Sequence, residues 1–323
     1  MKTIIGIDVS KASVDVAFTT EKPQYFVTRH FDSNSAQTAH LILKELPQQD
    51  LHVVLEATGT YGHRLATAFF EAGVPVSMVN PLCIKYFAQM HLKRAKTDAY
   101  DAKTIAAYGQ AVSLTMWQPR PLSHEKLRQV TKAIEDLNVI RLELLNRQEA
   151  YQQMPVQSEV CRAHYAKLVS EIQSSIVHLK KELESLAQET APEAYQNLLS
   201  IPGVGPGTAG VLLAHYGCFE EFERAAQVVA YAGLNPSVYQ SGTSVKGRGG
   251  ISKRGHASIR RSLYMAALSA IRYNPLCKCV YERLISKGKP KRVALLAVAH
   301  KLLRIAFGVV KRGQPFDPNY VPF

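Results

Sequence analysis

Short apolar runs of strand and helix length alternate along the first 115 residues. Three runs within residues 3–32 have strand length and are separated by turn residues such as Pro23. After them, the pattern predicts helix 35–46, strand 51–59, helix 60–73, strand 75–81 and helices 82–92 and 97–111. Because the later strands and helices have short connectors, these strands should pair in parallel through crossovers. We therefore predict an α/β domain over residues 1–115.

The pattern changes to helical spacing between residues 121 and 190. Apolar residues recur there three and four positions apart, at Leu127, Val130, Ile134 and Leu137 and again at Leu168, Ile172, Ile176, Leu179, Leu183 and Leu186. The spacing breaks near Met154 and Pro155. It predicts two long amphipathic helices that form an antiparallel hairpin or a coiled coil. A partner helix from a second copy of the chain is compatible with this pattern but not required by it.

A third, mainly helical region is predicted over residues 191–323. It opens with LLSIPGVGPGTAGVLLAHYG, in which residues 205–210 match the GxGxxG spacing of dinucleotide sites. No strand precedes this match and two prolines interrupt it, so we favour a helix-hairpin-helix with its turn at Gly203 and Gly205. Backbone N–H groups in such a turn can bind a nucleic-acid phosphate. A plain helical hairpin is the alternative.

Positive charge is concentrated near the C-terminus. The chain has a net charge of +13, and residues 241–323 hold 17 Lys and Arg against two acidic residues, whereas residues 1–240 have a net charge of −2. A region this basic indicates a polyanionic partner, and nucleic acid is the first candidate. A membrane surface is less favoured, because the single tryptophan, Trp117, lies far from the basic region.

Several other classes of protein are not favoured. No apolar run reaches the roughly 18 residues that span a bilayer. The N-terminal sequence does not have the shape of a signal peptide, and the five scattered cysteines do not suggest a disulfide framework. Cys277 and Cys279 form only a CxC, so a zinc site is not expected. We therefore expect a cytoplasmic protein with no membrane partner.

Acidic residues interrupt or end apolar strands in the first region. Asp8 interrupts the first strand and Glu56 ends the fourth, where a charge is costly unless it is paired or binds a metal ion. If these strands are neighbours, both carboxylates reach one edge of the sheet. Asp98 and Asp101, three apart on the last helix, would close the site. Four carboxylates without nearby His or Cys favour Mg²⁺ or Mn²⁺, and two such ions can act on a phosphodiester.

Each acid also has an ordinary structural explanation. Asp8 can hydrogen-bond in a turn, and Glu56 can form a salt bridge. Asp98 can cap its helix, with Asp101 in the first turn, where acids favour the helix dipole. We prefer the metal interpretation because the predicted order of strands and helices brings all four acids together.

The segment SGTSVKGRGGISKRGHASIRRSL, which starts at residue 241, combines hydroxyl groups, glycines and basic side chains. Gly242 allows the backbone at Ser241 to approach a ligand closely. Cations that can bind phosphates are present at Lys246, Arg248, Lys253, Arg254, Arg260 and Arg261. The spacing alone does not separate Ser241 from Thr243 and Ser244, and His256 is the nearest candidate base. A polar glycine-rich loop without catalytic function is the alternative.

Taken together, these motifs resemble those of the DEDD-type insertion-sequence transposases, which include the Piv-like DNA invertases and the bridge-RNA-guided recombinases. They are DVS, EATGTY, KTDAYDA, SIPGVG, YAGLNP, YQSGTSVKG and RRSLY, spread in this order over residues 3–316. The resemblance implies a RuvC-like, ribonuclease-H-type first domain with an Asp, Glu, Asp, Asp tetrad. That tetrad corresponds to Asp8, Glu56, Asp98 and Asp101.

The resemblance also implies a mechanism and partners. Ser241, the first serine of SGTS, would attack DNA and form a covalent phosphoserine intermediate. The partners would be target and donor DNA, a structured noncoding guide RNA (a bridge RNA) and further copies of the chain in a homo-oligomer, either a dimer or a tetramer. Apart from the resemblance, a serine hydroxyl is a poor nucleophile unless a base or a metal activates it, so we hypothesise that the metal tetrad activates Ser241, within one subunit or across two.

We therefore expect an RNA-guided, Mg²⁺- or Mn²⁺-dependent DNA recombinase that acts through Ser241. The alternative is a metal-dependent, junction-resolving nuclease in which water attacks and no serine is needed. A third possibility is a non-catalytic nucleic-acid scaffold, which gives Asp8 and Glu56 only a structural role.

Overall fold

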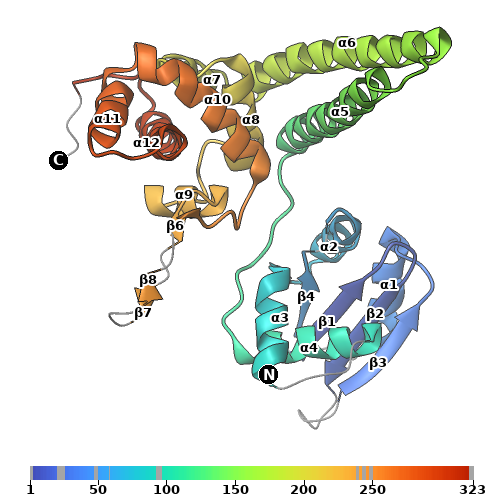
Figure 1. Cartoon of the computed structure of the whole chain (residues 1–323). Helices are drawn as coiled ribbons and strands as arrows, with labels where there is room; N and C mark the ends of the chain where they lie inside the picture. The colour runs from blue at the N-terminus through green and yellow to red at the C-terminus, as the bar shows by residue number, and fades with distance from the viewer. Residues whose placement is uncertain are drawn as a thin grey trace. The chain divides into compact units, whose positions relative to one another are not determined.

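The computed structural model describes residues 3–19, 26–46, 50–57, 59–91, 97–237, 240–241, 245–246 and 250–319. It divides into two compact units, Met1–Arg120 and Pro121–Phe323 (Figure 1). The helical region 121–190 belongs to the second unit, together with the helices that follow it.

The first unit is built on a five-stranded mixed sheet (Figure 1). Its strands are β1 Thr3–Val9, β2 Val14–Thr19, β3 Phe26–Phe31, β4 Leu51–Glu56 and β5 Val76–Val79. They lie in the order β3-β2-β1-β4-β5, with β1, β2 and β3 antiparallel and β1, β4 and β5 parallel. The predicted α/β class is thereby confirmed, and the first and fourth strands are neighbours.

Helices cover both faces of this sheet. They are α1 Ala36–Glu45, α2 Tyr61–Glu71, α3 Pro81–Met90 and α4 Asp98–Ala111. Ile5 and Ile7 of β1 pack with α1 and α2 in one core, whereas Ile4 packs with Ile105 of α4 in another. Because side chains alternate along a strand, Gly6 and Asp8 share the α4 face with Ile4.

Helix α4 lies unusually close to β1. A Cβ atom at Gly6 would overlap backbone atoms of Ala102 and Ala106, which are buried on α4. A Cβ atom at Gly109, further along α4, would lie 2.8 Å from Ile4 Cγ2. The glycines and alanines at this crossing therefore set the separation between the helix and the strand.

The segment after α4 runs back along the sheet. The Trp117 N–H group donates a hydrogen bond to Val76 O at 2.7 Å, and Ser77 Oγ donates to Thr115 O at 2.7 Å. The Trp117 ring packs against the core formed with α1 and α2, and it meets Phe70 edge-on. This segment is therefore part of the first unit.

The second unit is mainly helical, as predicted. Its helices are α5 Leu122–Gln152, α6 Glu159–Thr190, α7 Pro192–Leu199, α8 Pro206–Tyr216, α9 Ala225–Ala232, α10 Ala257–Tyr273, α11 Pro275–Ser286 and α12 Lys291–Arg312. Helices α5 and α6 form a long hairpin whose break falls where the sequence predicts it (Figure 1). Leu127 and Leu183 join the hairpin to the core around α8.

Two pairs of very short strands interrupt this unit between α9 and α10. Strand β6 Pro236–Ser237 pairs with β9 Gly250–Ile251, and β7 Gln240–Ser241 pairs with β8 Val245–Lys246, both antiparallel. The sequence pattern predicted no strands here. The described residues between α9 and α10 thus include two separate antiparallel strand pairs.

Helix α12 is the one helix of the described residues that is long and apolar enough to cross a membrane by length and composition. Lys301 and Arg304 lie within it. Its buried residues, which include Val298 and Leu302, pack in the core of the second unit. This packing is that of a core helix.

Replacing Gly6 with alanine should destabilise the first unit, because the added methyl group has to push α4 away from β1. We expect Gly6→Ala to lower the free energy of unfolding by about 1–3 kcal/mol, the usual cost of overpacking. Urea denaturation followed by circular dichroism measures this change. The matched control is Gly62→Ala on α2, whose Cβ would meet its nearest atoms at 3.9 Å and should be tolerated. Equal stability of the two variants would contradict the proposed close contact.

Candidate active site

The four acidic residues that the sequence predicts as metal ligands lie at one end of the first unit. Asp8 is the penultimate residue of β1 and Glu56 is the last residue of β4, and the two strands are parallel neighbours. Asp98 and Asp101 lie in the first turn of α4, the helix that crosses the same face of the sheet. The architecture thus places all four acids near the carboxyl ends of the two strands.

The helix that carries Asp98 begins one residue earlier than a cap at Asp98 would require. Thr97 occupies the N-cap position, and Asp98 is the first residue of α4. The interpretation of Asp98 as the cap is therefore wrong. Asp98 is exposed, and Asp101 is partly buried in the same turn.

The electrostatics of Asp8 show that these acids influence one another. Burial and neighbouring negative charges raise the pKa of Asp8 from 3.8 to about 6. In order of effect, the charges belong to Asp101, Asp98, Glu56 and Asp15. Asp8 is in no ion pair among the residues that the structure describes. The described residues therefore form an acidic cluster around Asp8, and none of their basic side chains pairs with Asp8.

An acidic cluster of this kind favours a divalent cation, and an all-oxygen set of ligands suits Mg²⁺ or Mn²⁺. As the side chains stand, however, no three His, Cys, Asp or Glu residues in the described parts of the chain come close enough together to hold a metal ion. The acids are gathered within electrostatic range but do not converge on one point.

Asp15 is an acidic neighbour that the sequence reasoning missed. It lies on β2 directly opposite Asp8, and it is only 7% exposed. Both of its carboxylate oxygens lie 3.1 Å from Nδ1 of His30 on β3, and this hydrogen bond and the charge of Asp15 raise the pKa of His30. The signal was available, since Asp15 is the only charged residue in the apolar run of β2.

The second group of predicted residues lies at the short strands of the second unit. Ser241 ends β7 and pairs with Val245, while Lys246 of β8 pairs with Gln240. Only the backbone of these residues is described, and Gly242, Thr243, Ser244 and Arg248 lie outside the described residues. The predicted roles of Ser241, Lys246 and Arg248 therefore stay predictions.

Four further basic residues flank this ladder on its C-terminal side. Lys253, Arg254 and Arg261 are exposed. Arg260 is different, because its Nη1 donates a hydrogen bond to Ala232 O at 2.9 Å, at the last residue of α9. A cation at the C-terminal end of a helix is stabilising, so Arg260 has a structural role beside any contact with nucleic acid.

His256, the nearest candidate base in the sequence, packs in an aromatic cluster. Its ring centroid lies 4.7 Å from that of His215 and 4.6 Å from that of Tyr231. A hydroxyl group also meets an imidazole here, since Ser258 Oγ lies 2.8 Å from His215 Nε2. Ser258 is only 8% exposed, so this pair joins α8 to α10 and does not face a substrate. No local sequence pattern indicates this contact between two distant helices.

The two glycines of the predicted helix-hairpin-helix have different surroundings. Helix α7 ends at Leu199 and α8 begins at Pro206. Gly203 has a φ of +101°, and a Cβ atom there would lie 2.6 Å from the Cβ of Ala270 on α10, so packing alone requires glycine. Gly205 is exposed, and a Cβ atom there would meet nothing within 4 Å. Gly205 is the better candidate for a phosphate contact.

Two family models match the chain in succession. Residues 5–151 match a model of DEDD-type IS110 proteins described as "Transposase". Residues 195–282 match a model described as "Transposase IS116/IS110/IS902 family".

Curated relatives match along nearly the whole chain. The pilin gene-inverting protein of Moraxella lacunata is 32% identical over 324 residues, which cover 98% of this chain and 98% of that protein. The pilin gene-inverting protein of Moraxella bovis is also 32% identical, over 325 residues and the same shares. The transposase for insertion sequence element IS1111A of Coxiella burnetii is 24% identical over 97% of this chain and 91% of its own length.

Among solved structures, the chain is similar to RuvC of Thermus thermophilus. The sequence identity is 16%, the alignment covers 36% of this chain and 99% of RuvC, and the TM-score is 0.28. RuvC of the same organism in complex with a Holliday junction substrate gives 14% identity and the same TM-score of 0.28. The α/β fold class of the first unit therefore rests on its sheet order.

Replacing Asp8 with asparagine should change how stability depends on pH. The folded protein binds the Asp8 proton more tightly than the unfolded chain, since its pKa is about 6 and not 3.8. This contribution to stability is complete below about pH 3.8 and is lost as the pH rises through about 6. We therefore expect Asp8→Asn to be more stable than the wild type at pH 7, and to lose that advantage at pH 4. Urea unfolding in a chelating buffer measures both values.

The control for this experiment is Asp50→Asn, which changes an exposed acid of the same unit. Its effect on stability should be the same at both pH values. Added Mg²⁺ should stabilise the wild type at pH 7 and have a smaller effect on Asp8→Asn. A pH-independent difference between Asp8→Asn and the wild type would contradict the raised pKa.

Two adjacent arginines test the structural role of Arg260. Arg260→Ala removes the hydrogen bond to Ala232 O and should lower the free energy of unfolding of the second unit by about 1.5–3 kcal/mol, the range for hydrogen bonds to charged groups. Arg261→Ala is the control, since Arg261 is exposed and should change stability by less than about 0.5 kcal/mol. Thermal unfolding of both variants would show the contrast, and equal melting temperatures would refute it.

Proposed function

Because this chain belongs to the IS116/IS110/IS902 family of transposases, we propose that it recombines DNA through a serine nucleophile, at sites selected by a guide RNA. Membership of the family makes the chain an enzyme that cleaves and rejoins DNA. Our proposal adds four parts to this activity: a bound metal ion, a serine nucleophile, a guide RNA and an oligomeric assembly. Each part rests on particular residues.

The observation that carries the proposal is the acidic cluster around Asp8. A partly buried carboxyl group whose pKa is raised to about 6 by its burial and by four neighbouring acids is unfavourable for the folded chain, and such groups cluster at functional sites. We assign Asp8, Glu56, Asp98 and Asp101 as the residues that would hold Mg²⁺ or Mn²⁺. When bound, such an ion would stabilise negative charge that develops on the oxygens of a phosphodiester.

Ser241 is the nucleophile in this proposal. Its Oγ attacks the phosphorus of a DNA strand, the bond from phosphorus to the leaving strand's oxygen breaks, and that oxygen takes up the serine's proton. The product is a phosphoserine ester, and attack by the hydroxyl group of another strand reverses the step and frees the serine. The support is the position of Ser241 at the end of β7, in a segment of the chain that continues past β9 into the exposed cations Lys253 and Arg254.

The basic second unit is the proposed surface for target DNA, donor DNA and the guide RNA. Exposed cations such as Lys253, Arg254 and Arg261 can bind phosphates of either nucleic acid. The exposed backbone at Gly205, where α8 begins, is a further candidate contact. Such contacts hold the strands, and base pairing with the RNA would select the sequence. A cytoplasmic location follows from this role.

We further propose that the chain works as a homo-oligomer, a dimer or a tetramer. The α5–α6 hairpin extends beyond the core of its unit and carries large exposed apolar side chains. They include Val139, Ile140, Leu142, Val156 and Val160. Apolar groups this exposed favour contact with a second copy. How the hairpins of two copies pair would determine whether the acids and Ser241 that act together come from one subunit or from two.

A metal-dependent nuclease is the second candidate function. All four acids belong to the first unit, whereas Ser241 belongs to the second. The acidic cluster could therefore act on DNA with water as the nucleophile and without the serine. The two functions differ in whether the protein becomes attached to the DNA.

The attachment of protein to DNA separates these two functions. The purified protein with its copurified RNA is incubated with DNA and Mg²⁺, denatured, and examined for a covalent protein–DNA adduct. We expect an adduct with the wild type and with Ser244→Ala, and none with Ser241→Ala. Asp98→Asn should reduce adduct formation by at least about 100-fold, the scale at which loss of one electrostatic contact to a transition state acts.

Each result has one meaning. An adduct that survives Ser241→Ala contradicts the assigned nucleophile, and free DNA ends without any adduct favour the nuclease. If Asp98→Asn leaves the adduct intact, the acids are not part of the serine step. Sequencing of the copurified RNA tests the guide, and the absence of a structured RNA would remove that part of the proposal.

A further inference from the structure

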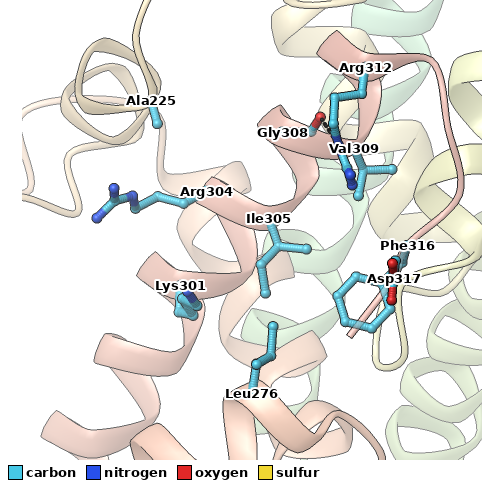
Figure 2. Close-up of a pocket in the computed structure, with 10 residues that line it drawn as sticks. All are labelled: Ala225, Leu276, Lys301, Arg304, Ile305, Gly308, Val309, Arg312, Phe316 and Asp317. Carbon is cyan, nitrogen blue, oxygen red and sulfur yellow. Dashed lines mark hydrogen bonds between the residues drawn. The ribbon is translucent and has the colours of Figure 1, made fainter. Parts of the chain in front are cut away.

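A cavity of about 300 Å³ lies on the outer face of α12 in the second unit (Figure 2). Helix α12 forms one wall, Leu276 of α11 and Phe316 lie beside it, and Ala225 at the start of α9 closes another side. A volume of this size is at the lower end of the range for small-molecule sites, about 300–1,000 Å³. It excludes a double helix but admits a single nucleotide.

The walls of the cavity are fixed by hydrogen bonds from the core. The Phe316 N–H group donates to Ser200 Oγ at 2.7 Å, which ties the segment after α12 to the end of α7. The fully buried Asn274 caps α11, since its Oδ1 accepts hydrogen bonds from the N–H groups of Leu276 and Cys277. The cavity is therefore preformed and is not a gap between mobile chain segments.

The lining of the cavity combines an apolar floor with a basic rim. In Figure 2, Leu276, Ile305 and the ring of Phe316 face a common space beside α12. Lys301, Arg304 and Arg312 stand at intervals along the same helix, and Asp317 is the only acid in the lining. Within the part of the chain that the structure describes, Lys301 and Arg304 form no ion pair. The lining thus matches a ligand with one flat apolar part and a negative charge.

Gly308 keeps this cavity open. It lies inside α12, where glycine is unfavourable, and a Cβ atom there would meet nothing within 4 Å. Two other helical glycines have a packing reason, since a Cβ atom at Gly109 or Gly210 would lie 2.8 Å from another side chain, whereas Gly207 in the first turn of α8 has no such contact. No such contact explains Gly308 either, and the space above it is open to a ligand.

We propose that the cavity between α11, α12 and Phe316 binds one unpaired nucleotide of a nucleic-acid strand, with its base on the apolar floor and its phosphate at the basic rim. Stacking of an unpaired base on an aromatic ring, beside cations that contact the backbone, is the usual way in which proteins hold single strands. The inference rests on the proposed function, in that the second unit has to bind nucleic acid at all. Beyond that function, the inference identifies the place in the second unit where an unpaired base is bound.

Filling the cavity from Gly308 tests this inference. Gly308→Leu adds an apolar side chain whose Cβ atom would meet nothing within 4 Å, and leucine favours the helix, so its melting temperature should equal or exceed that of the wild type. We expect its affinity for a fluorescent single-stranded oligothymidylate of about 12 nucleotides to fall about tenfold, the scale of one lost base stack. Affinity for a blunt duplex of the same length should not change. Fluorescence anisotropy of the full-length chain measures both.

The matched control is Val293→Leu, which enlarges an exposed residue of the same helix outside the cavity and should leave both affinities unchanged. Phe316→Leu keeps an apolar side chain at the floor but removes the ring, and it should also weaken single-strand binding selectively. A uridine-containing RNA strand of the same length tests whether the site accepts RNA as well as DNA. Selective loss with either strand supports the proposal.

The outcomes separate this inference from the function on which it rests. If the wild type binds neither strand nor duplex, the proposed nucleic-acid surface fails. If the wild type binds both and Gly308→Leu binds the single strand equally well, the nucleotide site is overturned while the function stands. If thymidine monophosphate binds the protein more tightly than the oligonucleotide does and displaces it, the cavity is a site for a free nucleotide. That result would overturn the proposal that it holds a nucleotide of a strand.

Discussion

The contact of α4 with β1 at Gly6 is the constraint on which the first unit depends. Because Gly6 has no side chain, Ala102 and Ala106 can rest on the strand itself, and the first turn of α4 is brought to the end of the sheet. The same face of β1 carries Asp8 two residues later. The steric fit and the acidic cluster are therefore linked, because the helix that packs most closely also carries two of the four acids.

The two units carry candidate functional residues of opposite charge. In the first, burial and the charges of neighbouring acids raise the pKa of Asp8, a cost that a bound cation would remove. In the second, cations outnumber acids, and one of them, Arg260, donates a hydrogen bond to the last residue of α9. A phosphodiester carries negative charge that exposed basic residues can bind, and its oxygens are ligands that divalent cations accept.

The fold was predictable wherever hydrophobic periodicity is strong. Strands β1 and β4 were predicted because each is a short apolar run in which Asp8 or Glu56 is the only acid, and their pairing, a condition of the predicted site, is confirmed by the sheet order. Asp15 was missed, although β2 is almost entirely buried and a charge in its apolar run is as costly there as at Asp8. The ladder around Ser241 could not be predicted, since strands of two residues leave no periodic signal. The packing of Gly203 on Ala270 depends on a distant helix, which local patterns do not reveal.

The hydrogen bonds that hold Trp117 and Thr115 on β5 shorten the connection between the units. Only the stretch from Trp117 to Leu122, where α5 begins, joins one folded body to the other. Fully extended, five residue steps reach about 17 Å. A tether this short sets a high effective concentration of one unit near the other, of millimolar order for short linkers, and its geometry decides which pairs of surfaces can meet.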